Sequence, residues 1–195
     1  MKIFALMCSH RKNKNTEFAL DCFLKGFEKD NEIVKRRLVD SDIKVCIACE
    51  YCRKNLGKCV HKDDMSEIID EMLTSDLIVF ATSLYFNSVP SLFKIMIDRT
   101  QVLYNARYVI KDPIFKERKP VVFVAVGGSR TYGNQFEGIH LEAEHFLNNI
   151  NGTVIDFIKF NNTDRQPVID NEDAEKLLIN KGAEIESIIS DGSWK

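Results

Sequence analysis

The sequence predicts a doubly wound α/β protein, in which five parallel strands form one sheet with helices on both faces. Three observations lead to this prediction. Short apolar runs alternate with segments of helical periodicity along the whole chain. Two runs, Leu77–Ala81 and Pro120–Val126, are apolar throughout, as is typical of strands covered on both faces. The 195 residues suffice for one such domain, and no internal repeat or linker divides them.

The expected strands are short, and their polarity differs with their expected place in the sheet. The second is the more polar one, as expected near an edge. The five cover Lys2–Met7, Glu32–Leu38, Leu77–Ala81, Pro120–Val126 and Val154–Phe160.

Helices are expected between the strands, because apolar residues recur there every three or four positions. They cover Thr16–Phe27, a segment from Asp63 or Asp64 through Leu73, a segment from Ser88 through Val102, Glu137–Asn149, and a last helix at about 171–189. Two have start signals: Asp63 or Asp64 can cap the second, and Ser88 with Pro90 the third. All of them belong to a single expected domain that spans residues 1–195.

Composition excludes several classes of protein. Hydrophobic residues make up 45% and charged residues 29%, with a net charge of −2, which argues against a nucleic-acid partner. No run of 18 apolar residues exists, and the first ten residues become polar too soon for a signal peptide. We therefore expect a cytoplasmic protein with no membrane association.

Doubly wound sheets bind ligands outside the carboxyl ends of their strands, at the topological switch point. Function is therefore expected just after Met7, Thr82 and Val126. The segment after Met7 supplies hydroxyls, amides and cations directly before a helix. A phosphate monoester at that helix N-terminus would meet free backbone N–H groups and the positive end of the helix dipole. The alternative is a solvated basic turn that simply caps the helix.

The other two strand ends suit a planar ligand. Tyr85 and Phe86 stand beside small polar residues, and together these offer a ring platform with hydrogen-bond donors. The alternative is that both are ordinary core aromatics. Gly127 and Gly128 end the most apolar strand and would let the backbone approach a ring closely. The fingerprints G-x-G-x-x-G and G-x-x-x-x-G-K-[ST] are absent, which disfavours a bound dinucleotide and a P-loop.

Four cysteines, Cys46, Cys49, Cys52 and Cys59, fall within fourteen positions, in an expected loop insertion at about 44–62. The C-x2-C-x2-C run resembles those that hold iron–sulfur clusters, and the fourth cysteine closes the site after a glycine-containing loop. Zinc prefers two separated C-x2-C pairs, and only one compact run exists here. A metal-free thiol loop is the remaining alternative. We expect Cys8 and Cys22 to pack as small hydrophobes.

These segments together resemble those of a known family. Ser9–Thr16 is similar to the S-P-R-K-x-G-N-T loop of flavodoxin-like NAD(P)H-dependent FMN reductases, with His10 and Lys14 as departures. Thr82–Val89 is similar to that family's S-P-x-Y-F/W segment. Phe93–Arg99 resembles its L-K-x-F-x-D-R signature, whose Asp98 and Arg99 we expect to anchor the helix or a subunit contact. The cysteine spacing, followed by Asp-Asp-Met, resembles that of the iron–sulfur flavoproteins within the family.

The resemblance implies a flavodoxin-like sheet of strand order 2-1-3-4-5. It implies FMN as cofactor, NAD(P)H as electron donor, and a 4Fe-4S cluster on Cys46, Cys49, Cys52 and Cys59. The residues expected to bind FMN lie in the three strand-end loops: Ser9, Arg11, Lys12, Asn13, Asn15, Thr16, Ser83, Leu84, Tyr85, Phe86, Asn87, Gly127, Gly128, Ser129 and Tyr132. No side chain is expected to act as a catalytic acid or base.

Two functions remain open from the sequence. The first is an FMN-dependent oxidoreductase that takes electrons from NAD(P)H. The second is an electron carrier that relays electrons between ferredoxin and FMN through the cluster, without nicotinamide use. A third hypothesis is a non-redox protein whose cysteine loop binds zinc, and the flavin-like loops disfavour it. The resemblance also implies a homodimer or homotetramer.

Overall fold

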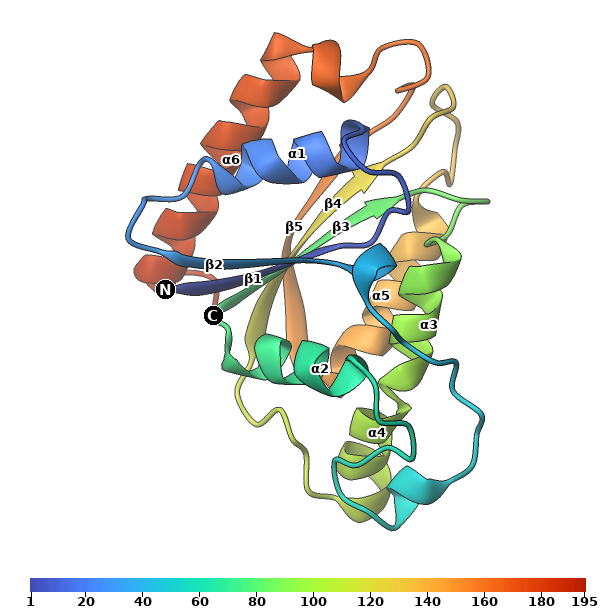
Figure 1. Cartoon of the computed structure of the whole chain (residues 1–195). Helices are drawn as coiled ribbons and strands as arrows, with labels where there is room; N and C mark the ends of the chain where they lie inside the picture. The colour runs from blue at the N-terminus through green and yellow to red at the C-terminus, as the bar shows by residue number, and fades with distance from the viewer.

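A computed structural model describes all residues, 1–195. Five parallel strands form one sheet of order β2-β1-β3-β4-β5, as predicted (Figure 1). The strands are β1 Lys2–Met7, β2 Glu32–Arg37, β3 Leu77–Ser83, β4 Lys119–Val126 and β5 Gly152–Phe160. The order reverses between β1 and β3, which makes the carboxyl ends of these two strands the switch point.

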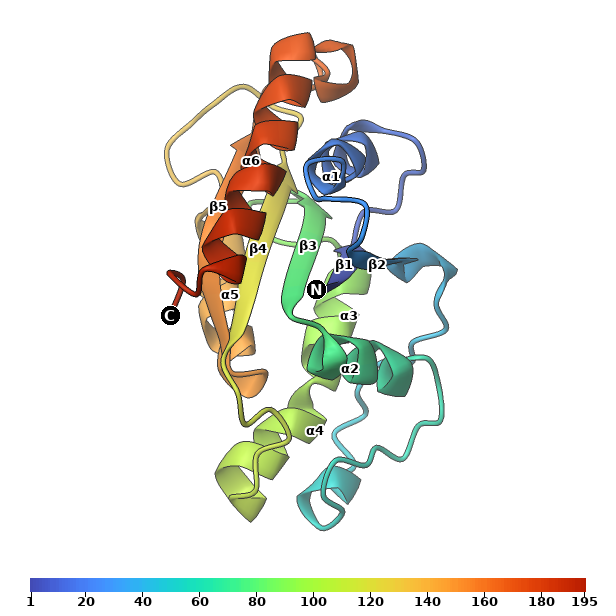
Figure 2. The same cartoon turned by 90° about the vertical axis from the view of Figure 1, so that its left-hand side faces the viewer.

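Helices cover both faces of the sheet (Figures 1 and 2). The helices are α1 Asn15–Leu24, α2 Met65–Thr74, α3 Ser91–Arg99, α4 Gln101–Tyr104, α5 Glu137–Asn149 and α6 Glu172–Ser190. Three 3₁₀ turns, η1 Leu38–Asp40, η2 Tyr51–Arg53 and η4 Val168–Asp170, and one π-helix, η3 Asn105–Ile110, complete the chain. None of these helices combines the length and apolar composition needed to cross a membrane.

Alternation along the strands divides the core in two. In β1, Ile3, Ala5 and Met7 face α1 and α6, whereas Phe4 and Leu6 face α2, α3 and α5. The first cluster holds 20 buried residues and the second 24, so neither face of the sheet is left open. The central strands β1, β3 and β4 are buried almost throughout, which explains why their sequences are continuously apolar.

One helical rod runs far beyond the expected end at Val102. It consists of α3, α4 and η3, and it extends from Ser91 to Ile110 with an interruption at Thr100. The expected cap of this rod is wrong. Pro90 occupies the N-cap position without a side-chain bond, and the Ser88 hydroxyl instead donates to Glu142 at 2.6 Å.

Segment 41–64, between η1 and α2, contains the four clustered cysteines. It lies beside α4 and η3, on the side of the sheet covered by α2, α3 and α5 (Figure 1). Its only helical turn is η2. The cysteine segment is thus held against the rod, at the end of α3 that is remote from the strand-end loops.

Candidate functional site

The arc between β1 and α1 stands open to solvent. Its two ends are buried, because Ser9 and Thr16 are each only 5% exposed. Between them, Arg11, Lys12 and Asn13 are exposed. The arc is therefore anchored at both ends and does not fold into the core, so it leaves room for a phosphate group.

The N-terminus of α1 offers unpaired donors at this arc. Lys14 occupies the N-cap position and makes no side-chain cap bond. The first N–H groups of a helix have no intrahelical partner, so those of Asn15 and Thr16 are free to meet an anion. Because α1 begins at Asn15, both residues lie in its first turn and not in the preceding loop.

Glu17, which sequence analysis did not single out, holds the arc from below. Its Oε2 accepts the Asn13 N–H at 2.7 Å, and Asn13 has a positive φ of 53°. Lys35 Nζ lies 3.2 Å and Arg37 Nε 3.5 Å from its Oε1. Burial opposes ionisation of Glu17, but the Asn13 hydrogen bond and Lys35 outweigh it and lower the pKa of the carboxyl.

Two expected phosphate contacts have protein partners in the structure. Lys12 Nζ lies 2.9 Å from Asp40 Oδ1. Asn15 donates to the Thr163 carbonyl at 3.5 Å and accepts the Ile169 N–H at 3.3 Å. Asn15 thus ties the arc to the segment after β5, and its role toward FMN, like that of Lys12, remains a prediction.

A tight hairpin turn follows β3. Tyr85 and Ser88 exchange two backbone hydrogen bonds of 2.9 Å, and Phe86 and Asn87 form the tip with φ of 48° and 63°. This pair of positive φ values is typical of a type I′ turn, a conformation that a bulky residue such as Phe rarely adopts. Phe86 is fully exposed, and Tyr85 is 46% exposed. Both aromatics therefore face outward, and the alternative that they are core residues is wrong.

The loop after β4 approaches this turn. The Tyr132 hydroxyl donates to Asn87 Oδ1, so the second and third loops are joined. Gln135, which is buried, donates to Ser129 Oγ at 3.2 Å. Gly128 is packed so closely that a Cβ there would lie 2.7 Å from the Asp164 carboxylate. A side chain at this position would collide with a neighbouring loop.

That neighbour is a fourth loop, Asn161–Gln166, which the sequence did not single out as part of a site. Asn162 N–H donates to the Ser129 carbonyl at 2.8 Å, and Asp164 N–H to the Gly128 carbonyl at 3.1 Å. The signal that could have revealed it is its position directly after β5. A polar segment there lies at the same sheet edge as the other three loops.

Three buried polar atoms at this edge have no partner within the protein. They are Ser83 Oγ, Gln135 Oε1 and Asn162 Oδ1. An unpaired buried polar group costs roughly 1–3 kcal/mol, so such atoms commonly mark a place where a ligand supplies the missing partner. Together with the open arc and the outward aromatics, they fit a ligand with an anionic end and a polar heterocycle, as FMN has.

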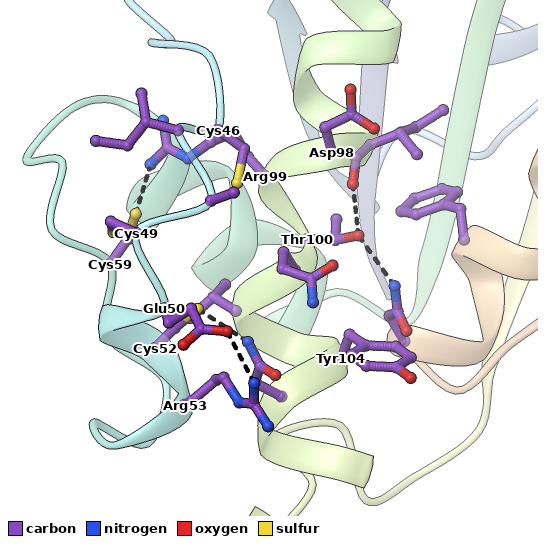
Figure 3. A pocket seen from close by; sticks show the side chains of 18 of the residues that line it. Cys46, Cys49, Glu50, Cys52, Arg53, Cys59, Asp98, Arg99, Thr100 and Tyr104 are labelled. Atoms are coloured by element: carbon purple, nitrogen blue, oxygen red, sulfur yellow. Dashed lines mark hydrogen bonds and ion pairs between the residues drawn. The ribbon is translucent and has the colours of Figure 1, made fainter. Parts of the chain in front are cut away.

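A cavity of about 1030 Å³ lies elsewhere, between the cysteine segment and the helices α3, α4 and α5. Figure 3 shows Cys46, Cys49, Cys52 and Cys59 on the loop side of this cavity, with Thr100 and Tyr104 on the helical side. None of the residues predicted to bind FMN lines it. The cysteine cavity and the strand-end loops are therefore two separate places on the molecule.

All six cysteines are free thiols. Cys46 and Cys49 are exposed, whereas Cys52 and Cys59 are half-buried. No three Cys, His, Asp or Glu side chains lie in an arrangement that would hold a single metal ion. A four-iron cluster places one thiolate on each of four irons, so its sulfurs lie farther apart than the ligands of one ion. Four thiols around one cavity fit such a cluster in donor type and number.

Cys8 and Cys22 are fully buried, as expected. Burial raises the pKa of both thiols, that of Cys8 well above its usual range. Neither Cys8 nor Cys22 lines the cavity of the four clustered cysteines. Both are therefore small core residues.

Of the expected anchoring residues of α3, Arg99 is turned inward and Asp98 outward. Lys94 and Asp98 form an exposed ion pair of 2.5 Å. Arg99 is 3% exposed and pairs with Asp63, with Nη1 2.5 Å from Oδ2 and Nη2 3.0 Å from Oδ1. The same guanidinium reaches Cys59 Sγ at 3.4 Å (Figure 3). Arg99 thus anchors the cysteine segment to α3.

Helix α3 connects the two places. At its beginning, Ser91 Oγ lies 3.5 Å from His10 Nε2 in the arc. At its end, Arg99 contacts Cys59. The nine residues of α3 rise about 12 Å from first to last, so this one helix extends from the arc to the cysteine segment.

A doubly wound sheet of this strand order, with open loops at the carboxyl ends of its strands, is typical of flavodoxin-like proteins. Within that class, a family model described as NADPH-dependent FMN reductase matches residues 1–176. This chain belongs to the NADPH-dependent FMN reductase family.

Curated relatives within this family are named iron-sulfur flavoproteins. One from Methanosarcina thermophila is 31% identical over 147 residues, which cover 72% of this chain and 71% of that protein. Another, from Archaeoglobus fulgidus, is 32% identical over 144 residues, which cover 72% of this chain. The match spans 66% of the length of the Archaeoglobus protein, so about a third of that relative has no counterpart in the match.

Solved structures of low identity share the fold. A flavone reductase superposes with a TM-score of 0.73 at 20% identity, over 99% of this chain and 64% of that chain. The NAD(P)H:quinone oxidoreductase from Methanothermobacter marburgensis superposes with a TM-score of 0.66 at 16% identity, over 95% and 97%. The predicted fold and the predicted family are both confirmed.

Proposed function

We propose that this chain is an FMN-dependent oxidoreductase of the iron–sulfur flavoprotein type, which takes electrons from NAD(P)H and passes them to an acceptor. The observation that carries the proposal is the open arc at the N-terminus of α1, which lies at the same edge of the sheet as the loops after β3, β4 and β5. Membership of the NADPH-dependent FMN reductase family supports it.

The arc would hold the phosphate of FMN. The Ser9 and Thr16 hydroxyls lie at its buried ends, and the first N–H groups of α1, which have no partner within the helix, follow directly after it. Arg11 is exposed on the arc and can swing toward the anion. The helix dipole contributes only about 0.3–1 kcal/mol, so most of the affinity must come from these hydrogen-bond donors.

The two following loops would hold the ring. The unpartnered Ser83 Oγ and Gln135 Oε1 supply polar contacts, and the backbone at Gly127 and Gly128 permits a close approach. The Tyr132–Asn87 contact fixes these loops to one another. Bound FMN supplies the hydride and single-electron chemistry, so this chain needs no catalytic acid or base and serves to bind and orient.

For the cysteine cavity we propose a 4Fe-4S cluster on Cys46, Cys49, Cys52 and Cys59. The names of the curated relatives support this proposal. The four thiols around one cavity support it as well. Zinc and a metal-free thiol loop are the competing occupancies, and iron and zinc analysis of anaerobically purified protein distinguishes all three.

A second candidate function is an electron carrier between ferredoxin and FMN that does not use nicotinamide. The path along α3 favours it, because this helix contacts the arc at Ser91 and the cysteine segment at Arg99, so a cluster in the cavity could relay electrons to the flavin. The family model favours the NADPH-dependent reductase over this candidate.

One experiment tests both functions. Protein reconstituted with FMN under anaerobic conditions should show flavin absorbance that NADPH or NADH bleaches. Bleaching by reduced ferredoxin but by neither nicotinamide would select the electron carrier. Failure to take up FMN at micromolar concentration would reject both.

We also propose a homodimer or homotetramer. Apolar side chains are exposed around the cysteine cavity and at the tip of the β3 turn, which is typical of surfaces that another chain covers. They include Val45, Ile47, Tyr51, Phe86, Tyr104 and Tyr108. Light scattering coupled to gel filtration measures the subunit number directly, and a monomer at micromolar concentration would contradict this part of the proposal.

A further inference from the structure

Two of the four clustered cysteines accept hydrogen bonds from side chains outside their own segment. Arg99 Nη2 lies 3.4 Å from Cys59 Sγ, and Asn105 Nδ2 lies 3.0 Å from Cys52 Sγ. Both distances are within the range of N–H···S contacts. The two acceptor sulfurs are the half-buried ones, while Cys46 and Cys49 are exposed.

The Arg99 donor is locked in place. Its guanidinium forms a two-point contact with Asp63 and donates to the Lys44 carbonyl at 2.7 Å. Asp63 in turn accepts the Lys44 N–H at 2.9 Å. Since Lys44 lies just before Cys46 and Asp63 just after Cys59, Arg99 clamps both ends of the cysteine segment at once.

The Asn105 donor lies at a change of helix type. Asn105 is the first residue of the π-helix η3, directly after α4, and it is 4% exposed. π turns inside helices are rare and occur frequently at functional sites. Here the π-helix places the buried Asn105 amide where it donates to Cys52 Sγ. The rod thus offers a second N–H group, after that of Arg99, to the cysteine segment.

We propose that Arg99 and Asn105 are positioning residues for the cysteine cavity: they hold the sulfurs of Cys59 and Cys52 in place, and their N–H groups raise the reduction potential of the cluster bound there. The second half of this inference rests on the proposed function. Hydrogen bonds to cluster sulfurs stabilise the added negative charge of the reduced state, so they shift the potential upward.

The first test uses the reconstituted holoprotein and the variants Asn105→Leu and Arg99→Lys. Leucine matches asparagine in size but has no side-chain N–H group. Lysine keeps the positive charge of Arg99 but cannot make the two-point contact of a planar guanidinium. Each variant should lower the cluster midpoint potential in a spectroelectrochemical titration, with iron per chain and flavin potential as in the wild type. Asn148→Leu, which changes an exposed cavity residue on α5, should leave the cluster potential unchanged.

The second test needs no cluster. In the metal-free chain, loss of either donor should speed amide hydrogen exchange in residues 44–62 by about fivefold, as expected when one hydrogen bond is lost. Exchange elsewhere in the chain should be unchanged. If Arg99→Lys fails to fold, Asn105→Leu decides alone, because it leaves the ion pair with Asp63 intact.

The outcomes distinguish the positioning role of Arg99 and Asn105 from their effect on the cluster potential. Wild-type protein that binds FMN but no iron would reject the cluster proposed above, and hydrogen exchange would then decide the positioning role alone. Unchanged exchange in Asn105→Leu would overturn the positioning role. A full cluster with an unchanged potential in this variant would overturn the effect on the potential.

Discussion

The carboxylate of Asp63 is one of the most tightly bound groups in the molecule. Its side chain is 1% exposed, and it accepts both arms of Arg99 together with the N–H groups of Lys44 and Met65. Burial by itself would raise the pKa of Asp63, but these donors lower it to about 2. Because the Asp63 carboxylate has this many hydrogen-bond donors, the Asp63–Arg99 ion pair can be buried where an unpaired charge would be costly.

Stability should therefore depend on pH through Asp63. The folded-state pKa lies below the unfolded value of about 3.9, so the contribution is complete above about pH 5 and is lost as pH falls toward 2. The loss should be about 2 kcal/mol, measured by urea unfolding across this pH range.

The matched variant is Asp63→Asn, which keeps the shape but leaves Arg99 without its counter-charge. We expect it to lower the free energy of unfolding at pH 7 by about 3 kcal/mol, with less dependence on pH below 5 than the wild type. Equal slopes for the two proteins between pH 5 and 2 would show that Asp63 is not the titrating group.

Glu17 holds the arc as Asp63 holds the cysteine segment, through a carboxylate that accepts a backbone N–H group. Glu17→Ala should release the Asn13 N–H and let the arc relax, and it should weaken FMN binding by roughly fivefold, the effect of about one lost hydrogen bond. Quenching of flavin fluorescence measures this affinity. Asp21→Ala is the control, because Asp21 pairs with the same Lys35 at 2.6 Å but does not touch the arc. A similar loss in both variants would assign the effect to Lys35.

Phe86 combines full exposure with a positive φ, which is unfavourable for a bulky residue. Phe86→Asn should raise the free energy of unfolding by about 1 kcal/mol, because asparagine tolerates this conformation. It should at the same time weaken flavin binding or subunit association, since the aromatic ring is lost. Phe86→Leu, with the same backbone strain, should unfold like the wild type in a urea titration; a gain in both variants would contradict the strain argument.

At the scale of elements, α6 packs against the end of α1 and the turn that follows it, where Gly182 of α6 meets Gly26 of the turn. A Cβ on Gly182 would lie 2.2 Å from the Phe23 carbonyl oxygen and 3.0 Å from Gly26 Cα. The same is true in the other direction, because a Cβ on Gly26 would lie 2.1 Å from the Ile179 carbonyl oxygen. The backbones of the two helices thus touch, and this contact sets their separation over one face of the sheet.

Gly182→Ala should consequently destabilise the protein although alanine favours helices. The gain in helix propensity is about 1 kcal/mol, whereas the backbone collision costs roughly 3 kcal/mol, so unfolding should become easier by about 2 kcal/mol. Thermal and urea unfolding measure the change. Ser187→Ala on the exposed face of α6 is the control and should change little. A stabilised Gly182→Ala variant would mean that the two helices can move apart freely.

At the scale of the whole molecule, FMN should stabilise the fold through the arc. At a concentration one hundred times its Kd, a ligand contributes about 2.7 kcal/mol, which corresponds to a rise in Tm of roughly 5–10 °C for a chain of this length. Riboflavin, which has the ring but no phosphate, should give less than half of this shift at the same concentration. Equal shifts for the two flavins, measured by scanning calorimetry, would contradict the role assigned to the arc.

The sequence predicted the strands well because burial on both faces leaves a local pattern. The expected Lys2–Met7 agrees with β1 at both ends, and β3 extends only two residues beyond the expected Ala81. Helix beginnings were less predictable. Ser88 has the chemistry of a cap, yet its hydroxyl donates to Glu142 on α5, a residue 54 positions away that local sequence cannot bring near.

The sequence alone determined the fold class and the family, because these depend on apolar periodicity and on short motifs. From the ends of its strands it also predicted where a ligand would bind, and that part stays a prediction. Only the tertiary structure decided which side chains meet. Arg99 reaches Cys59 across 40 positions, Asn105 reaches Cys52 across 53, and the fourth loop closes over Gly128. Such contacts depend on how separate elements pack in three dimensions, and no spacing along the chain encodes that packing directly.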